Sequence, residues 1–542
     1  MKKLLGILLC LALLTSIFAC FSVGASAEGS TLNVAWTADV ETIDVHLTTA
    51  DYQIPLNVYD RLFEISIDAD TNSAVLNNSL VESYTVSDDS LTYSFVLKDG
   101  ILFSDGSALT ADDVAYSFTR MVALEESQQE YLFECVEGYE EFTGSGNYHD
   151  AVLTGIEVQD ATHFTMTLSK PYAGFLNILA SPACCIYSKA ACEAAGDSFG
   201  TDYTAAIGSG AYVITSWTRD AGMTLSYNEN YWQDAPDFTE VNIQVIPSAD
   251  TMSMMFQAGE LDILDCDKLD STVVGATYKT LYADKLVSST RLGTSYMALN
   301  ASSEALSDPV ARKAVQMCID RDTIIATILN GDAVTVDGIY PQGLVGYTED
   351  NQGWLTYDVA GAQAMLEEAG YTKDADGYYF SFTIENDENN SSSRQLVIQA
   401  IAEQLKAAGI NCEIRNNDHS SWLAMRKAGE IDAYVSTWTA DYNDPDNFIA
   451  TFWGSASSTL GRSLCYGDED VMARVSAAPA ILDESERLAE YADLEKQIVE
   501  TDASWVPLYV QTHLFVLSEN VASFVPHWAG YSDFVFATVK AA

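Results

Sequence analysis

Two separate stretches of this chain show the same succession of signals: a helix, a glycine at its end and a short apolar strand. The first predicts a helix over 250–259 and a strand over 261–264, and the second predicts a helix over 421–429 and a strand over 431–436. Glycine is favoured at the end of a helix because it adopts a left-handed conformation without strain. Helices that alternate with strands predict an α/β fold with mixed sheets. We therefore expect two lobes, each with one copy of this unit.

Other parts of the chain carry signals for both kinds of element. Residues 91–97 alternate apolar and polar side chains, as a half-buried strand does. Thr110 precedes Asp112 and Asp113, an order that favours a helix start, because the Thr caps the helix and the acids suit its positive end. Further helices are expected over 309–317, 359–369 and 394–408, and further strands over 31–40, 224–227, 240–246, 378–385 and 411–415.

The charge balance limits the possible partners. Lys and Arg number 26 against 78 Asp and Glu, which gives a formal net charge of −52. Recognition of phosphate groups needs a basic face, so this composition argues against nucleic acid and against an anionic membrane surface. Hydrophobic residues still make up 48% of the chain, more than an acidic disordered protein contains. The 542 residues therefore predict a globular protein of two to four domains or lobes with an acidic surface.

The first 27 residues have the pattern of an export signal. Lys2 and Lys3 precede an apolar run over 4–19, and a small-x-small cleavage site ends at Ala27. An alternative exists, because Cys20 follows Ile-Phe-Ala and resembles an acylated lipoprotein cysteine. We expect an exported, extracytoplasmic protein, in the periplasm or on the outer face of the cytoplasmic membrane. Cleavage after Ala27 and a lipid anchor at Cys20 both stay open.

The sequence gives little support to a metal centre or to catalysis. None of its ten Cys forms a CxxC pair, and none of its six His belongs to an HExxH motif. We expect no metal, no cofactor and no catalytic residue, and we keep an exported hydrolase as a distant alternative because triads assemble from residues far apart. Cys184, Cys185 and Cys192 are close enough for one local disulfide, although burial as free thiols suits cysteine equally well.

Several blocks, in order along the chain, match one family. The longest is 80–118 (LVESYTVSDDSLTYSFVLKDGILFSDGSALTADDVAYSF). The others are 208–212 (GSGAY), 228–232 (NENYW), 257–263 (QAGELDI), 297–300 (MALN), 310–321 (VARKAVQMCIDR), 364–371 (AMLEEAGY) and 438–448 (WTADYNDPDNF). On these residues the chain resembles the extracytoplasmic solute-binding proteins of peptide-type ABC importers, family 5, which include oligopeptide, dipeptide and nickel binders.

The resemblance implies a two-lobed, periplasmic-binding-protein-like fold of class II (cluster C), with a hinge-closed cleft. By analogy, lobe I comprises 28–290 with an inserted subdomain at about 61–204, lobe II comprises 291–501, and 502–542 returns to lobe I. The implied function is binding of a dipeptide or oligopeptide and its delivery to the permease subunits of an ABC importer. A nickel chelate, haem or another small molecule is the alternative ligand. We expect a monomer.

The block 438–448 holds the principal candidate for ligand binding. In peptide-binding relatives the Asp of a Trp-x-x-Asp motif holds the N-terminal ammonium of the peptide, and Asp441 matches that Asp. A carboxylate suits this role in a cleft that excludes water, because a charge-assisted hydrogen bond is stronger there. Its neighbours are also ligand-binding candidates: Trp438, Thr439, Ala440 and Tyr442.

Three further candidates lie elsewhere: Thr48 in the loop after the first strand, Trp422 as an aromatic wall, and Asn386 after a predicted strand. Dipeptide binders hold the carboxylate of the peptide with an Arg after this strand. Here the matching stretch is 386–390 (NDENN), and Arg394 follows later on a helix. An oligopeptide, or a ligand without a C-terminal carboxylate, is therefore favoured over a dipeptide. A cationic ligand also suits this acidic, amide-rich stretch.

Overall fold

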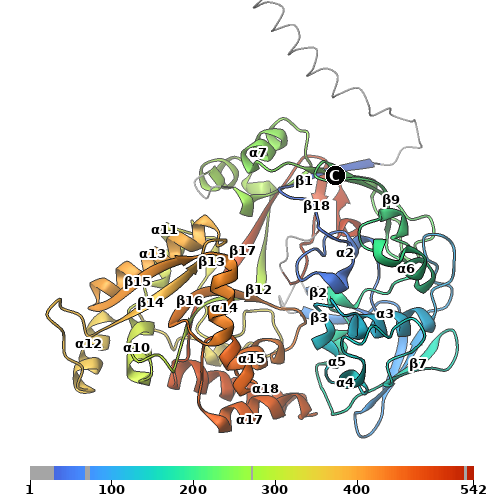
Figure 1. Ribbon diagram of the computed structural model, residues 1–542. Coiled ribbons are helices and arrows are strands. Elements are labelled where there is room, and N and C mark those ends of the chain that lie inside the picture. The colour runs from blue at the N-terminus through green and yellow to red at the C-terminus, as the bar shows by residue number, and fades with distance from the viewer. Residues whose placement is uncertain (1–29, 68–73, 270–272, 530–533) are drawn as a thin grey trace, which may run out of the picture.

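The computed structural model describes residues 30–67, 74–269, 273–529 and 534–542. Two lobes lie side by side, one coloured mainly blue to green and the other mainly yellow to orange (Figure 1). Both contain helices and strands, so the prediction of a mixed α/β fold is confirmed. The residue limits of the lobes stay a prediction, and the expected export signal lies outside the described residues.

A mixed sheet of eleven strands runs through both lobes. Its strand order is β15-β14-β16-β12-β17-β11-β1-β10-β9-β8, and β13 pairs with β17. The strands are β1 (Ser30–Trp36), β8 (Tyr212–Thr218), β9 (Gly222–Tyr227), β10 (Phe238–Val245), β11 (Ile263–Asp265), β12 (Leu286–Leu299), β13 (Ala333–Val334), β14 (Phe380–Asp387), β15 (Ile410–Asn417), β16 (Ala433–Thr439) and β17 (Trp505–Leu517). The stretch 31–40, which the sequence predicts as a strand leading into a loop, contains the end of β1 at Trp36 and the loop after it.

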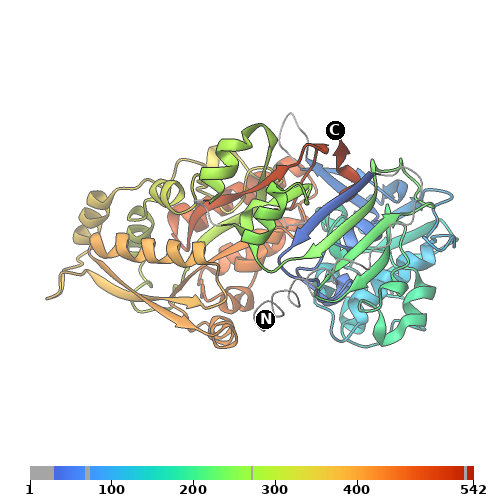
Figure 2. The same cartoon turned by 90° about the horizontal axis from the view of Figure 1, so that it is seen from above.

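Two long strands connect the lobes. β12 and β17 pair antiparallel along most of their length, with a break in register between Thr290 and Thr294. Beyond the break, β12 also pairs with β16 from Gly293 to Leu299, whereas before it β17 pairs with β11. The chain therefore crosses between the lobes along strands, as predicted, and Figure 2 shows green and red segments between the two lobes. An irregular register bends a strand locally, so we expect the hinge between the lobes at this break.

Helices cover the sheet in the second lobe. α10 (Pro309–Met317), α12 (Val359–Glu368) and α13 (Ser392–Ala407) share one apolar core with β14, β15 and β16. α10 spans the residues that the sequence predicts. The buried residues of α13 recur at helical spacing and form its inner face. The remaining longer helices are α7 (Ala249–Gln257), α11 (Arg321–Thr327), α14 (His419–Ala428), α15 (Asp446–Trp453), α16 (Ala456–Gly461), α17 (Glu469–Ala477) and α18 (Glu484–Lys496).

A separate four-stranded sheet belongs to the first half of the chain. Its order is β4-β5-β7-β6, from β4 (Val81–Val86), β5 (Thr92–Leu97), β6 (Ile156–Val158) and β7 (His163–Thr167), and α3 (Ala111–Ala123) accompanies it. Thr110 begins α3 as expected, because its backbone N–H donates to the Asp113 carboxylate (2.9 Å). The same carboxylate accepts from the Lys189 N–H (3.0 Å) and ties α3 to α6 (Lys189–Ala195).

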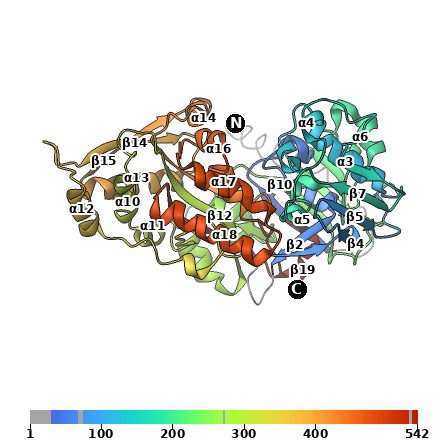
Figure 3. The same ribbon diagram turned by 90° about the horizontal axis from the view of Figure 1, so that it is seen from below.

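One apolar core joins this small sheet to the second lobe. It contains Phe95 of β5 and Phe452 of α15 among its buried members. The backbone N–H of Ala173 donates to the carbonyl of Pro479 (2.9 Å), so the main chains of the two parts also meet. Figure 3 shows β4, β5, β7 and α3 in one lobe and α17 and α18 in the other. The lobes are therefore in direct contact in this structure.

The cysteines are free thiols throughout the described part of the chain: Cys135, Cys184, Cys185, Cys192, Cys266, Cys318, Cys412 and Cys465. The thiols of Cys184 and Cys185 donate to the carbonyls of Ile178 and Pro182 (3.2 Å each), so no local disulfide forms there. Among the described residues, no helix is both long and apolar enough to span a bilayer.

Candidate functional site

The 438–448 block begins in β16 and continues into the loop before α15. β16 runs parallel to β14 and antiparallel to β12, and Trp438 and Thr439 are its last residues. The next N–H, of Ala440, donates to the carbonyl of Leu292 in β12 (2.8 Å). The loop therefore leaves the sheet at a strand end, where ligands bind in open α/β sheets. It also contacts the register break in β12.

Asp441 is held by Asn447 of α15. The Asn447 amide donates to the Asp441 carboxylate (3.0 Å) and accepts from the Asp441 N–H (2.9 Å). The same amide oxygen accepts from the Trp438 indole N–H (3.3 Å). The amide therefore orients the carboxylate of the half-buried Asp441 from both its donor and its acceptor side. Asn447 lies within the matching block, but the block alone gives no signal for this contact.

Trp438 packs against aromatic and cationic neighbours. Its ring meets Phe452 edge-on, with the centroids 5.6 Å apart. The Arg462 guanidinium lies 4.7 Å from the Trp438 ring centroid. Only part of the Trp438 side chain is buried. It therefore stands beside Asp441 as a fixed, partly accessible aromatic surface.

Tyr442 is buried, and it contacts the other lobe. Its hydroxyl lies 3.0 Å from that of Tyr172, and both phenols donate to the Asp446 carboxylate. Burial raises the pKa of both phenols far above its usual value, so they stay neutral donors. Tyr442 therefore contributes a contact between the lobes. The sequence offers no signal for Tyr172, because a contact between distant segments has no local pattern.

Thr48 lies in the first lobe, immediately after the short helix η1 (Val45–Leu47). Its hydroxyl accepts from the N–H groups of Ala50 and Asp51 (3.0 and 2.9 Å). Its carbonyl accepts from the Gln129 side chain, so the backbone here is fixed.

The helix before Thr48 rests on a buried ion pair. Arg120 donates twice to the Asp44 carboxylate (3.0 and 2.7 Å) and once to Nδ1 of His46 (2.8 Å). Because Arg120 only donates, Nδ1 accepts and the proton of neutral His46 is on Nε2. Burial lowers the pKa of His46 to about 3, so it stays neutral. This cluster holds in place the loop that carries Thr48.

The acidic, amide-rich stretch 386–390 begins inside β14, which extends to Asp387 and so includes Asn386, and it continues into the turn that follows. Asn386 is buried and donates to Asn416 of β15 (2.8 Å), and it accepts from Asn390 (2.8 Å). Arg394 reaches further than its place on a helix suggests. It donates to Asn390 (3.0 Å) and to the hydroxyl of Thr437 in β16 (2.9 Å), one residue before Trp438. A cation therefore lies beside the 438–442 block after all.

Trp422 differs from the candidate residues 438–441 in its surroundings. Its side chain is buried, its indole N–H donates to the carbonyl of Glu385 (3.1 Å), and its ring packs edge-on against Tyr434 (5.5 Å). These contacts belong to the core of the second lobe. The structure thus brings Trp438, Thr439, Ala440, Asp441 and Tyr442 together with Arg394. Asn386 is linked to Arg394 through Asn390, which hydrogen-bonds to both. Trp422 is buried in the core of the second lobe.

Residues 196–200 (GDSFG) match GxSxG, the pattern of the nucleophile elbow in serine hydrolases. A nucleophile elbow places its Ser on a sharp turn between a strand and a helix. Here the segment follows α6, and the Ser198 hydroxyl donates to the carbonyl of Ala195 (2.8 Å). This geometry is not that of a nucleophile elbow.

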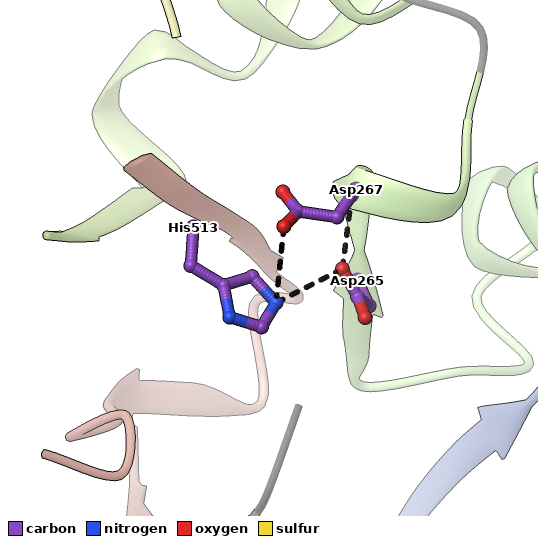
Figure 4. A group of neighbouring side chains, drawn as sticks. All are labelled: Asp265, Asp267 and His513. Carbon is purple, nitrogen blue, oxygen red and sulfur yellow. Dashed lines mark hydrogen bonds and ion pairs between the residues drawn. The ribbon is translucent and has the colours of Figure 1, made fainter. Parts of the chain in front are cut away.

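One group in the described part has donor atoms close enough for a metal ion: Asp265, Asp267 and His513 (Figure 4). Nε2 of His513 lies 3.2 Å from Asp265 and 3.6 Å from Asp267. However, Arg291 of β12 already pairs with the Asp267 carboxylate. Arg291 supplies the counter-charge that a metal would supply, so the group fits an internal ion-pair network better than a metal site.

The fold and the site together define a class of protein. Paired strands join two lobes, and a polar block at the end of β16 lies where the lobes meet. These are features of a solute-binding protein that closes around its ligand. The model of bacterial extracellular solute-binding proteins, family 5 Middle, matches residues 76–459. The chain belongs to this family.

Individual relatives are similar to most of the chain. The glutathione-binding protein GsiB of Salmonella paratyphi A is 26% identical over 457 residues, 83% of each chain. The probable D,D-dipeptide-binding periplasmic protein DdpA of Escherichia coli is 25% identical over 506 residues, 92% of each chain.

Solved structures show the same fold. NikA from Brucella suis in complex with Fe(III)-EDTA has a TM-score of 0.80 at 22% identity and covers 94% of this chain and 100% of its own. Listeria monocytogenes OppA bound to peptide has a TM-score of 0.71 at 20% identity and covers 95% and 99%.

Proposed function

We propose that this protein binds a peptide outside the cytoplasm and delivers it to the permease subunits of an ABC importer. Membership of the solute-binding family and the similarity to GsiB and DdpA, whose names state peptide ligands, support this function. The relatives are binding proteins, so a hydrolytic role has no support from them.

The observation that carries the proposal is the geometry of Asp441. Asn447 orients its carboxylate at a strand end with a neutral hydrogen bond, and Trp438 is held beside it by the same amide. The carboxylate is thus held in a defined position at the end of β16, beside an aromatic ring. We infer that Asp441 pairs with the N-terminal ammonium of the peptide and that Trp438, Thr439 and Ala440 line its first residues.

The other end of the peptide has a candidate partner in Arg394. Its guanidinium donates to Thr437 in β16, the strand that leads to the 438–448 block. Arg394 lies further along the chain after β14 than the corresponding Arg of dipeptide binders. A free carboxylate of the ligand can replace the neutral oxygens that Arg394 now contacts, because Arg prefers a charged acceptor. Thr48 would approach the ligand from the first lobe, and Asn386 would shape the cleft through its hydrogen bonds with Asn390 and Asn416.

The function is tested by thermal-shift screening with free di- to octapeptides, alongside nickel chelates, haem and amino acids at matched concentration. We expect a rise in the melting temperature for peptides and none for the other solutes. A shift with a nickel chelate or haem and none with peptides would replace the proposal by the alternative ligand class. Native mass spectrometry of the purified protein checks the same point, because a closed cleft retains its ligand.

The cellular location and the N-terminal processing are tested on the exported protein itself. We infer that the protein is extracytoplasmic, with either cleavage after Ala27 or an acylated Cys20. Intact-mass measurement distinguishes the two, because the first leaves Glu28 as the N-terminal residue and the second adds lipid to Cys20.

A further inference from the structure

A cavity of about 420 Å³ lies between the first half of the chain and the second lobe. One wall consists of residues 131–135 and 170–178, and the other of α15, α16 and the loop around Pro479. Both lobes therefore form it. A ligand group in this position would contact both lobes at once.

The floor of the cavity holds a buried carboxylate. Asp446 is 7% exposed and accepts hydrogen bonds from the phenols of Tyr172, Tyr442 and Tyr491. Within the described residues, no Lys, Arg or His forms an ion pair with it. Asp444, two residues earlier, pairs with Arg487 (2.7 Å). The two buried acids therefore differ: one has a cation and the other has only neutral donors.

The groups around Asp446 leave it negative at neutral pH. Burial raises its pKa to about 6, so the carboxylate is ionised at pH 7. The charged and titratable groups that act on it are the phenols of Tyr172, Tyr442, Tyr340 and Tyr491, the thiol of Cys135, the carboxylate of Asp444 and the exposed Lys170 at the rim. A buried charge without a directly paired counter-ion is unfavourable, so a cation that enters the cavity and contacts Asp446 gains from pairing with it.

The cavity adjoins the motif that holds the peptide. Asn447 lines the cavity and also donates to the Asp441 carboxylate (3.0 Å). Tyr442, which directly follows Asp441, lines it too. A peptide whose amino end lies at Asp441 therefore has its first side chains next to this opening.

We propose that the cavity is a subsite for a basic side chain near the amino end of the bound peptide, with its ammonium or guanidinium group paired with Asp446. The proposal rests on the proposed function and adds a preference within it. The overall negative charge of the protein, −52, works in the same direction by attracting cationic ligands.

The test compares three peptides that differ only in the first side chain: Lys, norleucine and Glu. Calorimetry at pH 7.5 should give the Lys peptide an affinity about tenfold or more above norleucine, because a charged hydrogen bond contributes about 1.5–3 kcal/mol and 1.4 kcal/mol corresponds to tenfold. In Asp446→Asn this preference should fall to about one. At pH 5, where Asp446 is protonated, the wild type should also lose most of it.

Two further variants separate a local contact from general charge. Asp470→Asn removes an exposed acid of α17 in the same lobe and should keep the Lys preference. Asp446→Glu retains the charge and should keep part of it, which excludes simple misfolding of the Asn variant. An equal loss in Asp470→Asn and Asp446→Asn would overturn the proposal.

The remaining outcomes distinguish this subsite from the function on which it rests. If all three peptides bind with equal affinity, the protein binds peptides but the subsite is refuted. If none binds, both proposals fail. Putrescine alone is the control for a free cation. If it binds in an Asp446-dependent way while the peptides show no preference, the cavity takes a free diamine and the peptide subsite is wrong.

Discussion

Asp444 and Asp446 lie two residues apart in one turn, yet their carboxylates have different partners. Asp444 is 1% exposed, pairs with Arg487 (2.7 Å) and accepts from the Asp446 N–H (3.1 Å). Asp446 faces a cavity and three phenols. The sequence presents both as acids beside Pro445, and only the fold separates an acid in an ion pair from an acid that lines a cavity.

Removal of the structural acid should destabilise the protein. In Asp444→Asn the buried Arg487 loses the carboxylate with which it pairs, and breaking one partner of a buried pair costs about 3–5 kcal/mol. Chemical denaturation at pH 7 measures this loss. Asp441→Asn is the matched comparison and should cost less than about 1 kcal/mol, because Asp441 is half-buried and held by an amide. Equal losses in the two variants would contradict the account of this turn.

Glu495 should make stability depend on pH. Burial raises its pKa to about 7, above the ordinary 4.5, while it accepts from Tyr340 (3.1 Å) and Asn351 (2.6 Å). The folded protein then binds this proton more tightly than the unfolded chain, so the contribution of Glu495 to stability falls as pH rises from about 4.5 to 7. Between pH 8 and pH 5, wild type should gain up to about 3 kcal/mol relative to Glu495→Gln.

The comparison with Glu495→Gln isolates this group, because the buried, neutral His46 and His527 titrate identically in both proteins. Urea unfolding at pH 5, 6.5 and 8 measures the difference. A difference that does not change with pH would show that Glu495 is ionised across the range.

The paired strands β12 and β17 connect the two lobes and contain the break at which we expect the hinge. Arg291 and Leu292 lie in the register break of β12. Arg291 pairs with Asp267 of the first lobe, whereas the carbonyl of Leu292 accepts from Ala440 beside the ligand motif. The expected hinge is thus ion-paired to the first lobe through Arg291 and hydrogen-bonded to the second lobe through Leu292.

Loss of the hinge ion pair should weaken the hinge. Arg291→Gln leaves the largely buried Asp267 with His513 and without its cation, and we expect a loss of about 1–3 kcal/mol in the free energy of unfolding. Arg415→Gln is the control, because its 3.5 Å pair with Glu385 involves a side chain that is 62% exposed. It should change stability by less than about 1 kcal/mol. Equal effects would argue against a special role for the hinge network.

At the level of elements, local patterns and long-range pairing differ in how well the sequence predicts them. α10 and the start of α3 follow from Pro309 and Thr110, because caps and helical periodicity are local signals. The pairing of β11 with β17 joins residues near 264 and 516, and no local pattern contains that information. For the same reason Asp441 is predicted by its motif, whereas Tyr172 and Gln129 are not.

For the whole molecule, lobe contact is the state that a ligand should favour. Phe95 and Phe452 belong to one core across the lobes, and Tyr172 and Tyr442 meet in the wall of the cavity. A ligand that binds only the folded protein adds about 2.7 kcal/mol at 100 times its dissociation constant. Denaturant unfolding with and without a saturating peptide should show this gain. The N-acetylated peptide at equal concentration should show much less.

The central claim is that Asp441 binds the N-terminal ammonium of a peptide, and calorimetry on four combinations tests it: wild type and Asp441→Asn, each with the free and the N-acetylated peptide. In the wild type, acetylation should cost about 2–5 kcal/mol, the penalty for unpairing one partner of a buried charge pair. In Asp441→Asn it should cost little more, because the partner is already absent. If acetylation weakens binding to the variant as much as to the wild type, the two groups do not interact and the assignment of Asp441 is wrong.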